Sequence, residues 1–175
     1  MLGLGVGAST SLSAEAAIPK SMPYSNAYSA FFDGAGDYID AHYQTDSTFQ
    51  GSFTIACWMR PTDGQGTGSQ TIFGAASSTD RVWFYMDTSG KLGFYHAANG
   101  DLALAGSIEV VFDNNAASDW VHVACVVVKS QGDTTYKFYK NGVALTTTAF
   151  LAVSATNHAA FTIAHDMYIG GLNSS

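Results

Sequence analysis

The sequence predicts an all-β domain built from antiparallel strands. Turn signals recur from about residue 28 onward, and short runs of β-branched and aromatic residues lie between them. Apolar residues show no sustained helical spacing, and no internal repeat occurs. The composition agrees, since 47% of residues are hydrophobic and only 12% are charged, which leaves too few Glu and Lys side chains for a helix bundle. This pattern is typical of a sandwich or barrel.

The 175 residues divide into a short arm and one domain. Residues 1–25 are rich in Gly, Ala and Ser, with Pro19 and Pro23 near the end, and predict an N-terminal arm. Residues 26–175 form the domain. The arm lacks a basic start and its apolar part is short and broken by glycine, so an exposed or partner-bound arm is favoured over an export signal.

Charge and hydropathy exclude two classes of partner. Seven Lys and Arg residues stand against fourteen Asp and Glu residues, a net charge of −7, and the cations are scattered. A phosphate backbone would be repelled, so nucleic acid is excluded. The longest apolar run, Val121 to Val128, is interrupted by His122 and has the length of a strand, so no membrane span is predicted.

Two hairpins are predicted. "TTYKFYKNGVALTTT" (134–148) closes at Asn141-Gly142, the pair that a type I′ turn requires. "RVWFYMDTSGKLGFYHA" (81–97) closes near Ser89-Gly90. Alternation in the first hairpin places two sets of side chains on opposite faces: Tyr136, Phe138 and Lys140 on one, Lys137 and Tyr139 on the other.

The run "WVHVACVVV" (120–128) predicts a central strand that is covered on both faces, because a strand buried on one face only would alternate. Trp58 and Trp120 are predicted to pack in the core, and Trp83 is left open between core and surface. Cys57 and Cys125 lie in apolar strand-like runs, which favours two buried thiols; a disulfide is the alternative.

Six segments, in order and spacing, resemble the laminin-G-like and pentraxin-like domains of the concanavalin A-like jelly-roll superfamily. The resemblance covers about residues 28–172 and implies a jelly-roll sandwich of two curved antiparallel sheets that binds glycans or proteins. The segments are "SAFFDGAGDYIDA" (29–41), "SFTIACWMRP" (52–61), "DTSGKLGFY" (87–95), "DWVHVACVVV" (119–128), "YKFYKNGVAL" (136–145) and "MYIGG" (167–171).

The chain departs from this family in two places. The family continues after the "IGG" strand into a strand like "GxIDEVxIY", which is missing before Ser175. Either a sheet edge lacks its usual cover, or another chain or a continuation of this one supplies it. Pentraxins join cysteines in "FTVC"-like and "VHIC"-like strands, whereas "FTIAC" and "VHVAC" carry them one position later. This shift places Cys57 and Cys125 diagonally, about 7 Å or more apart, and disfavours a disulfide.

The sequence carries no recognisable catalytic constellation. A retaining glycosidase needs two carboxylates about 5 Å apart, but Glu15 lies in the arm, and Glu109 and Asp113 would lie about 13 Å apart on a strand. No GxSxG elbow occurs, and Ser69 in "GTGSQ" reads as a turn residue. His122 reads as a core or half-buried residue, and His158 and His165 lack a third ligand. An enzyme is therefore not expected.

No cofactor is predicted, and calcium is a weaker alternative because relatives bind it with loop carboxylates. Turn formation explains most of the residues that would serve as ligands. They are Asp33, Asp37, Asp63, Asp101 and Asp113, with Asn99, Asn114 and Asn115 nearby.

A glycan site needs an exposed aromatic platform with a few polar partners. The second hairpin and the turn after it supply the candidate carbohydrate-binding residues: Trp83, Tyr85, Tyr95, His96, Asn99 and Asp101.

The arm and the opening of the domain also resemble small laminin-G-like proteins of bacteriophage structural genes. This implies a virion component, either a capsid decoration or a tail or fibre protein, with weak affinity for host surface glycans. Its partners would be other virion proteins or copies of itself, reached through the arm and the open edge. The alternative is a secreted bacterial carbohydrate-binding or adhesion module.

Overall fold

The computed structural model describes residues 29–44, 51–61, 67–76, 81–98, 101–112, 119–130, 133–151 and 166–171. Within these ranges every regular element is a strand, and the strands form two antiparallel sheets in the compact unit Phe32–Ser175. The predicted all-β, two-sheet jelly-roll sandwich is confirmed. None of these segments forms a helix that could cross a membrane. The predicted arm, residues 1–25, lies outside the described residues.

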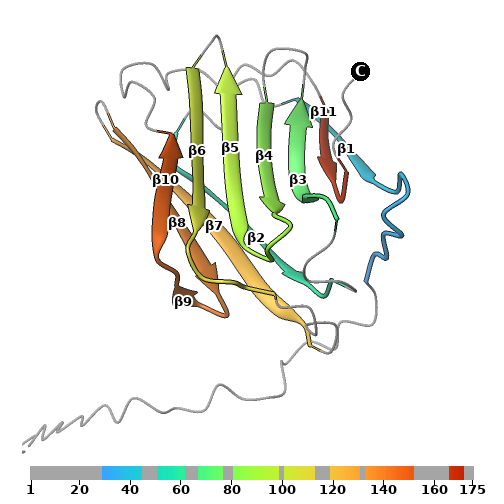
Figure 1. Ribbon diagram of the computed structural model, residues 1–175. Helices are drawn as coiled ribbons and strands as arrows, with labels where there is room; N and C mark the ends of the chain where they lie inside the picture. The colour runs from blue at the N-terminus through green and yellow to red at the C-terminus, as the bar shows by residue number, and fades with distance from the viewer. Residues whose placement is uncertain are drawn as a thin grey trace, which may run out of the picture. The chain divides into compact units, whose positions relative to one another are not determined.

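The larger sheet has seven strands in the order β1-β11-β3-β4-β5-β6-β10 (Figure 1). The predicted hairpin of residues 81–97 is present as β4 and β5, with Gly90 at a φ of 71° in the turn. The strands are β1 (Ile39–Gln44), β3 (Gln70–Ala76), β4 (Arg81–Met86), β5 (Leu92–Ala98), β6 (Asp101–Ser107), β10 (Thr147–Leu151) and β11 (Asp166–Ile169).

The smaller sheet has the order β2-β7-β8-β9, from Phe53–Met59, Val121–Ser130, Asp133–Lys140 and Val143–Ala144. Figure 1 shows β2 and β7 passing behind the larger sheet at an oblique angle. The predicted turn is confirmed, since Asn141 and Gly142 have φ values of 50° and 80° and a type I′ turn needs two positive values. Asn141 also accepts the backbone N–H of His122 on its side-chain oxygen at 2.9 Å, which ties this turn to β7.

The core fills the space between the two sheets. Val82, Phe84 and Met86 on β4 are fully buried, and they alternate with more exposed neighbours as a half-covered strand requires. Phe138 of β8 is also fully buried, and its ring centroid lies 6.4 Å from that of Phe84. This pair joins the sheets near the middle of the sandwich.

The central position predicted for residues 120–128 is confirmed, because β7 pairs with both β2 and β8. The prediction that this strand is covered on both faces is wrong in part. Val123, Cys125 and Val127 face the core and are fully buried, whereas His122 is half-buried and Val128 is 39% exposed on the outward face. An unbroken apolar run therefore does not show by itself that both faces are covered.

The predicted core positions of Trp58 and Trp120 are wrong. Their side chains are 44% and 45% exposed. On β2 the residues on either side of Trp58 pack on the core, so strand alternation turns Trp58 outward. Trp120 directly precedes Val121, which faces inward. The Trp58 ring lies 5.3 Å from that of His122, and the Arg60 guanidinium lies 5.6 Å from the Trp120 ring.

Cys57 and Cys125 are free thiols on the core side of paired strands. Cys57 pairs with Val123, and Cys125 pairs with Ile55, so the two cysteines are diagonal as predicted. Burial raises the pKa of the Cys57 thiol to about 11 and that of Cys125 further still. Both thiols are therefore protonated at neutral pH and react poorly as nucleophiles.

We expect iodoacetamide at pH 8 to alkylate the folded chain at least about tenfold more slowly than the urea-unfolded chain, because the thiolate is the reactive form. Mass spectrometry over time measures both rates. A Cys57→Ala variant assigns the remaining signal to Cys125, which we expect to be the slower. Equal alkylation rates in the folded and unfolded chains would contradict this prediction. So would a disulfide between the two cysteines, seen as a mass lower by two hydrogen atoms when no reductant is added.

Candidate functional site

Aromatic side chains gather on the outward face of the seven-stranded sheet. On β4, Trp83 and Tyr85 alternate with the buried core residues and are half-buried. Tyr95 on β5 pairs directly with Trp83, so it shares that face. Tyr168 on β11 reaches the same face, because Tyr168 pairs with Gly74 and Gly74 pairs with Trp83. We call these four residues the aromatic face.

Specific contacts fix the rings. Trp83 and Tyr85 stack with ring centroids 4.2 Å apart and an angle of 27° between the planes. The indole Nε1–H of Trp83 donates a hydrogen bond of 3.0 Å to the hydroxyl of Thr71 on β3. Tyr168 meets Tyr38 edge to face at 5.1 Å. These partners reduce the rotamer freedom that a ligand would otherwise have to remove on binding.

One cross-strand row organises the face. From β1 to β5 it runs through Asp40, Tyr168, Gly74, Trp83 and Tyr95. Two aromatic residues thus flank a glycine, which offers backbone but no side chain between them. A flat ligand could contact both neighbouring rings across this position.

Gly93 leaves the space that the Tyr85 ring occupies, because glycine has no side chain. The two residues pair across β4 and β5, and a Cβ added at Gly93 would lie 2.4 Å from Cζ of Tyr85. The ring therefore lies over the glycine backbone. Partial burial, and secondarily the Asp87 carboxylate, raises the pKa of the Tyr85 hydroxyl. Tyr85 is thus a neutral hydrogen-bonding group at physiological pH.

We expect Gly93→Ala to displace the Tyr85 ring while the fold is retained. The obstructing atoms are the far end of a side chain that can rotate, and alanine removes backbone freedom from the unfolded chain. The change in near-ultraviolet circular dichroism from the Trp83–Tyr85 stack would report the displacement, with far-ultraviolet spectra unchanged. Gly68→Ala is the matched control, since its Cβ meets nothing within 4 Å. An unchanged aromatic spectrum in Gly93→Ala would contradict this placement of Tyr85.

The structure brings three of the six predicted sugar-binding residues together: Trp83, Tyr85 and Tyr95. His96 does not join them, because it follows Tyr95 on β5, faces the core and is only 2% exposed. Asn99 lies outside the described residues. Asp101 begins β6, opposite Ala98, and its side chain is not among those described.

Arg81 and Tyr168 belong to this region and were not predicted. The guanidinium carbon of Arg81 lies 5.9 Å from the ring centroid of Trp83 and 5.8 Å from that of Tyr95. Alternation along "RVWFYM" places Arg81 on the same face as Trp83 and Tyr85. The position of Arg81 could therefore have been predicted from the sequence. Tyr168 reaches the face only through strand pairing between distant segments.

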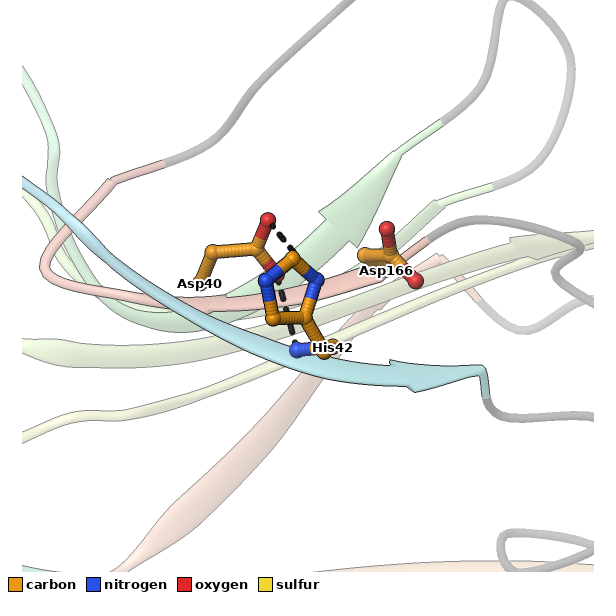
Figure 2. Close-up of side chains that lie close together, drawn as sticks. All are labelled: Asp40, His42 and Asp166. Atoms are coloured by element: carbon orange, nitrogen blue, oxygen red, sulfur yellow. Dashed lines mark hydrogen bonds and ion pairs between the residues drawn. The ribbon is translucent and has the colours of Figure 1, made fainter.

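A second group of polar residues lies where β1 and β11 meet (Figure 2). Asp40, His42 and Asp166 each offer one ligand atom, and these atoms lie within 4.8 Å of one another. Nδ1 of His42 lies 3.5 Å from the Asp40 carboxylate, and its backbone N–H donates a 2.8 Å hydrogen bond to the same group. One imidazole nitrogen with two carboxylates suits a transition metal ion better than calcium, so these residues could hold such an ion.

Two of the carboxylates considered for calcium binding, Asp33 and Asp37, accept hydrogen bonds from the backbone of their own loop. The backbone N–H of Ala35 donates to Asp33 at 2.7 Å, and that of Asp33 donates to Asp37 at 3.1 Å. This is the turn-forming role expected from the sequence. The other residues considered for metal binding lie outside the described parts of the chain: Asp63, Asn99, Asp113, Asn114, Asn115, His158 and His165.

Glu109, considered as a catalytic carboxylate, has a structural contact. Its Oε1 accepts a 3.1 Å hydrogen bond from the backbone N–H of Thr146. Hydrogen bonds from Thr146 lower the pKa of this exposed carboxyl group. Its proposed neighbour Asp113 and the arm residue Glu15 both lie beyond the described residues.

A sandwich of two antiparallel sheets is the architecture of the concanavalin A-like jelly-roll folds. The chain belongs to the concanavalin A-like lectin/glucanases superfamily, whose laminin-G-type family model matches residues 33–174. The predicted resemblance to the laminin-G-like domains of this superfamily is thereby confirmed.

Solved structures are similar to this chain at low sequence identity. Domains LG4-5 of the mouse laminin α1 chain are 13% identical with a TM-score of 0.52, and the match covers 78% of this chain and 32% of that one. The CBM40 module of the Ruminococcus gnavus IT-sialidase, bound to α2,3-sialyllactose, is 15% identical with a TM-score of 0.48. That match covers 70% of this chain and 65% of the module's chain. A search of curated proteins finds no match.

Proposed function

We propose that this chain is a non-enzymatic glycan-binding module and that the aromatic face is its contact surface. The observation that carries the proposal is the outward-facing set of Trp83, Tyr85 and Tyr95 on neighbouring strands of a lectin-type sandwich. Sugar rings present C–H groups on their flat sides, which pack on aromatic planes and bury apolar surface. The neighbouring Thr71 and Arg81 supply polar groups beside the rings.

The outward face of the smaller sheet is the competing surface. Trp58 and Trp120 are more exposed there, and their ring partners are His122 and Arg60. The aromatic face is favoured because Trp83 is already fixed by a stacking partner and an indole hydrogen bond. A preformed platform loses less side-chain freedom when it binds.

A glycan array with the purified full chain tests the proposal. We expect saturable binding to a subset of sugars, confirmed by titration calorimetry, with no release of reducing ends from the bound sugars. The second readout is needed because carboxylate oxygens of Asp40 and Asp166 lie within 4.8 Å of each other, close to the spacing used by retaining glycosidases. Binding to no glycan would overturn the proposal, and hydrolysis that Asp166→Asn abolishes would make the chain an enzyme.

We further propose that the module is a virion component, a capsid decoration or a tail or fibre protein. Support comes from the resemblance of the arm, residues 1–25, and of the opening of the domain to small laminin-G-like proteins of bacteriophage structural genes. The arm and an open sheet edge would bind other virion proteins or further copies of this chain. A secreted bacterial adhesion module would use the same aromatic face.

Deletion of residues 1–25 distinguishes a virion component from a secreted adhesion module. If the chain is a virion component, the full chain should co-sediment with particles or self-associate, and the truncated chain should not. A chain that is monomeric with and without the arm and is exported from the cell would support the adhesion module instead.

A further inference from the structure

We infer that the aromatic face selects sugars that carry a carboxylate group and that Arg81 binds this group. The inference rests on the proposed glycan-binding function and adds the charge class of the ligand. It follows from where Arg81 lies, what surrounds it and which of its hydrogen-bond donors remain available.

Arg81 is held between two rings of the candidate platform. Its guanidinium carbon lies 5.9 Å from the Trp83 ring on its own strand and 5.8 Å from the Tyr95 ring on β5. Both distances are within the range of a cation–π contact. The two rings therefore orient the guanidinium next to the surface on which a sugar would stack.

Within the described parts of the chain, these ring contacts leave the N–H groups of Arg81 available. A cation–π contact uses the charge of the guanidinium, whereas its five N–H donors point outward in the plane of the group. Among the described side chains no carboxylate forms a salt bridge with Arg81; the ion pair found there joins His42 and Asp40.

A half-buried cation that pairs with no carboxylate among the described side chains favours an anionic ligand. Partial burial of Arg81 removes water from the charge, so a carboxylate that replaces this water gains more than it would on an open surface. The planar fork of the guanidinium matches the two oxygens of a carboxylate. A sugar stacked on Trp83 or Tyr95 brings its substituents beside this fork.

Two acidic residues of the same sheet, Asp40 and Asp166, lie too far away to neutralise Arg81. Asp40 and Asp166 lie on β1 and β11, which are three and two strands from β4. These separations are about 14 and 10 Å, beyond the screening length of roughly 8 Å at physiological salt. These two carboxylates are therefore separated from the Arg81 cation, and their charge disfavours placing the carboxylate of a ligand at the β1–β11 edge.

Titration calorimetry on the full chain with two matched pairs of sugars tests the inference. One pair is trigalacturonic acid and galactotriose, and the other is sialyllactose and lactose, so the pairs separate uronic from sialic acids. We expect wild-type protein to bind the acidic member of one or both pairs at least about tenfold more tightly. Arg81→Gln should remove this preference, so that the acidic and the neutral member of each pair bind with affinities within about twofold of each other.

Arg81→Lys is the conservative variant, since it keeps the charge but loses the planar fork. It should retain part of the preference, and thermal unfolding of both variants should match wild type. Equal wild-type affinity within both pairs would overturn the inference and leave the proposed function standing. Parallel loss of acidic and neutral binding in Arg81→Gln would also overturn it. Binding to no sugar would overturn the proposed function and this inference with it.

Discussion

Phe84→Ala should lower the free energy of unfolding by about 3–5 kcal/mol, the usual cost of removing a buried phenylalanine ring. Phe84 is fully buried on β4, and its ring stacks at 6.4 Å on that of Phe138 from the opposite sheet. The loss therefore has two sources, the transfer of the ring from the core and a cavity between the sheets. Urea denaturation followed by tryptophan fluorescence measures the change.

Phe31→Ala is the matched control for this experiment, since it removes the same ring at a position that is 75% exposed. We expect it to change the free energy of unfolding by less than about 0.5 kcal/mol. Phe84→Leu, which refills part of the cavity, should fall between the two. A cost for Phe84→Ala no greater than that of Phe31→Ala would mean that the two sheets do not pack through this ring.

Local chemistry explains which parts of the fold could be predicted from the sequence. The turn at Asn141-Gly142 was predictable because positive φ values at both positions are a property of those residues in that turn. The hairpin of β4 and β5 was predictable from alternation on both sides of Gly90. In each case the signal and the structure lie within the same short segment.

Features that depend on distant segments were not predictable in this way. Trp58 and Trp120 were assigned to the core because tryptophan is usually well buried, but strand alternation turns both outward. Tyr168 joins the aromatic face only because β11 pairs with β3. Asp40 and Asp166 approach each other only because β1 pairs with β11. The register between two strands that are far apart in the chain cannot be predicted from the sequence of either strand alone.

Trp83→Ala should weaken glycan binding by roughly 10–100-fold, the range expected when a central aromatic anchor of an interface is truncated. The indole stacks on Tyr85 at 4.2 Å, bonds to Thr71 and pairs with Tyr95, so its removal takes away one ring and loosens another. Titration calorimetry with the best-bound glycan of the array measures the affinity. Trp83→Phe keeps an aromatic plane but lacks the indole N–H, and it should retain part of the binding.

Trp120→Ala decides between the two outward faces, because Trp120 is an exposed tryptophan on the smaller sheet with its own arginine contact, Arg60. It is the same substitution as Trp83→Ala, made beside the smaller sheet instead of on the larger one. We expect its glycan affinity to stay within about twofold of wild type. The opposite result, loss of binding in Trp120→Ala and retention in Trp83→Ala, would move the contact surface to the smaller sheet. Arg81 would then have no part in recognition, because the two sheets present their outward faces to opposite sides of the core.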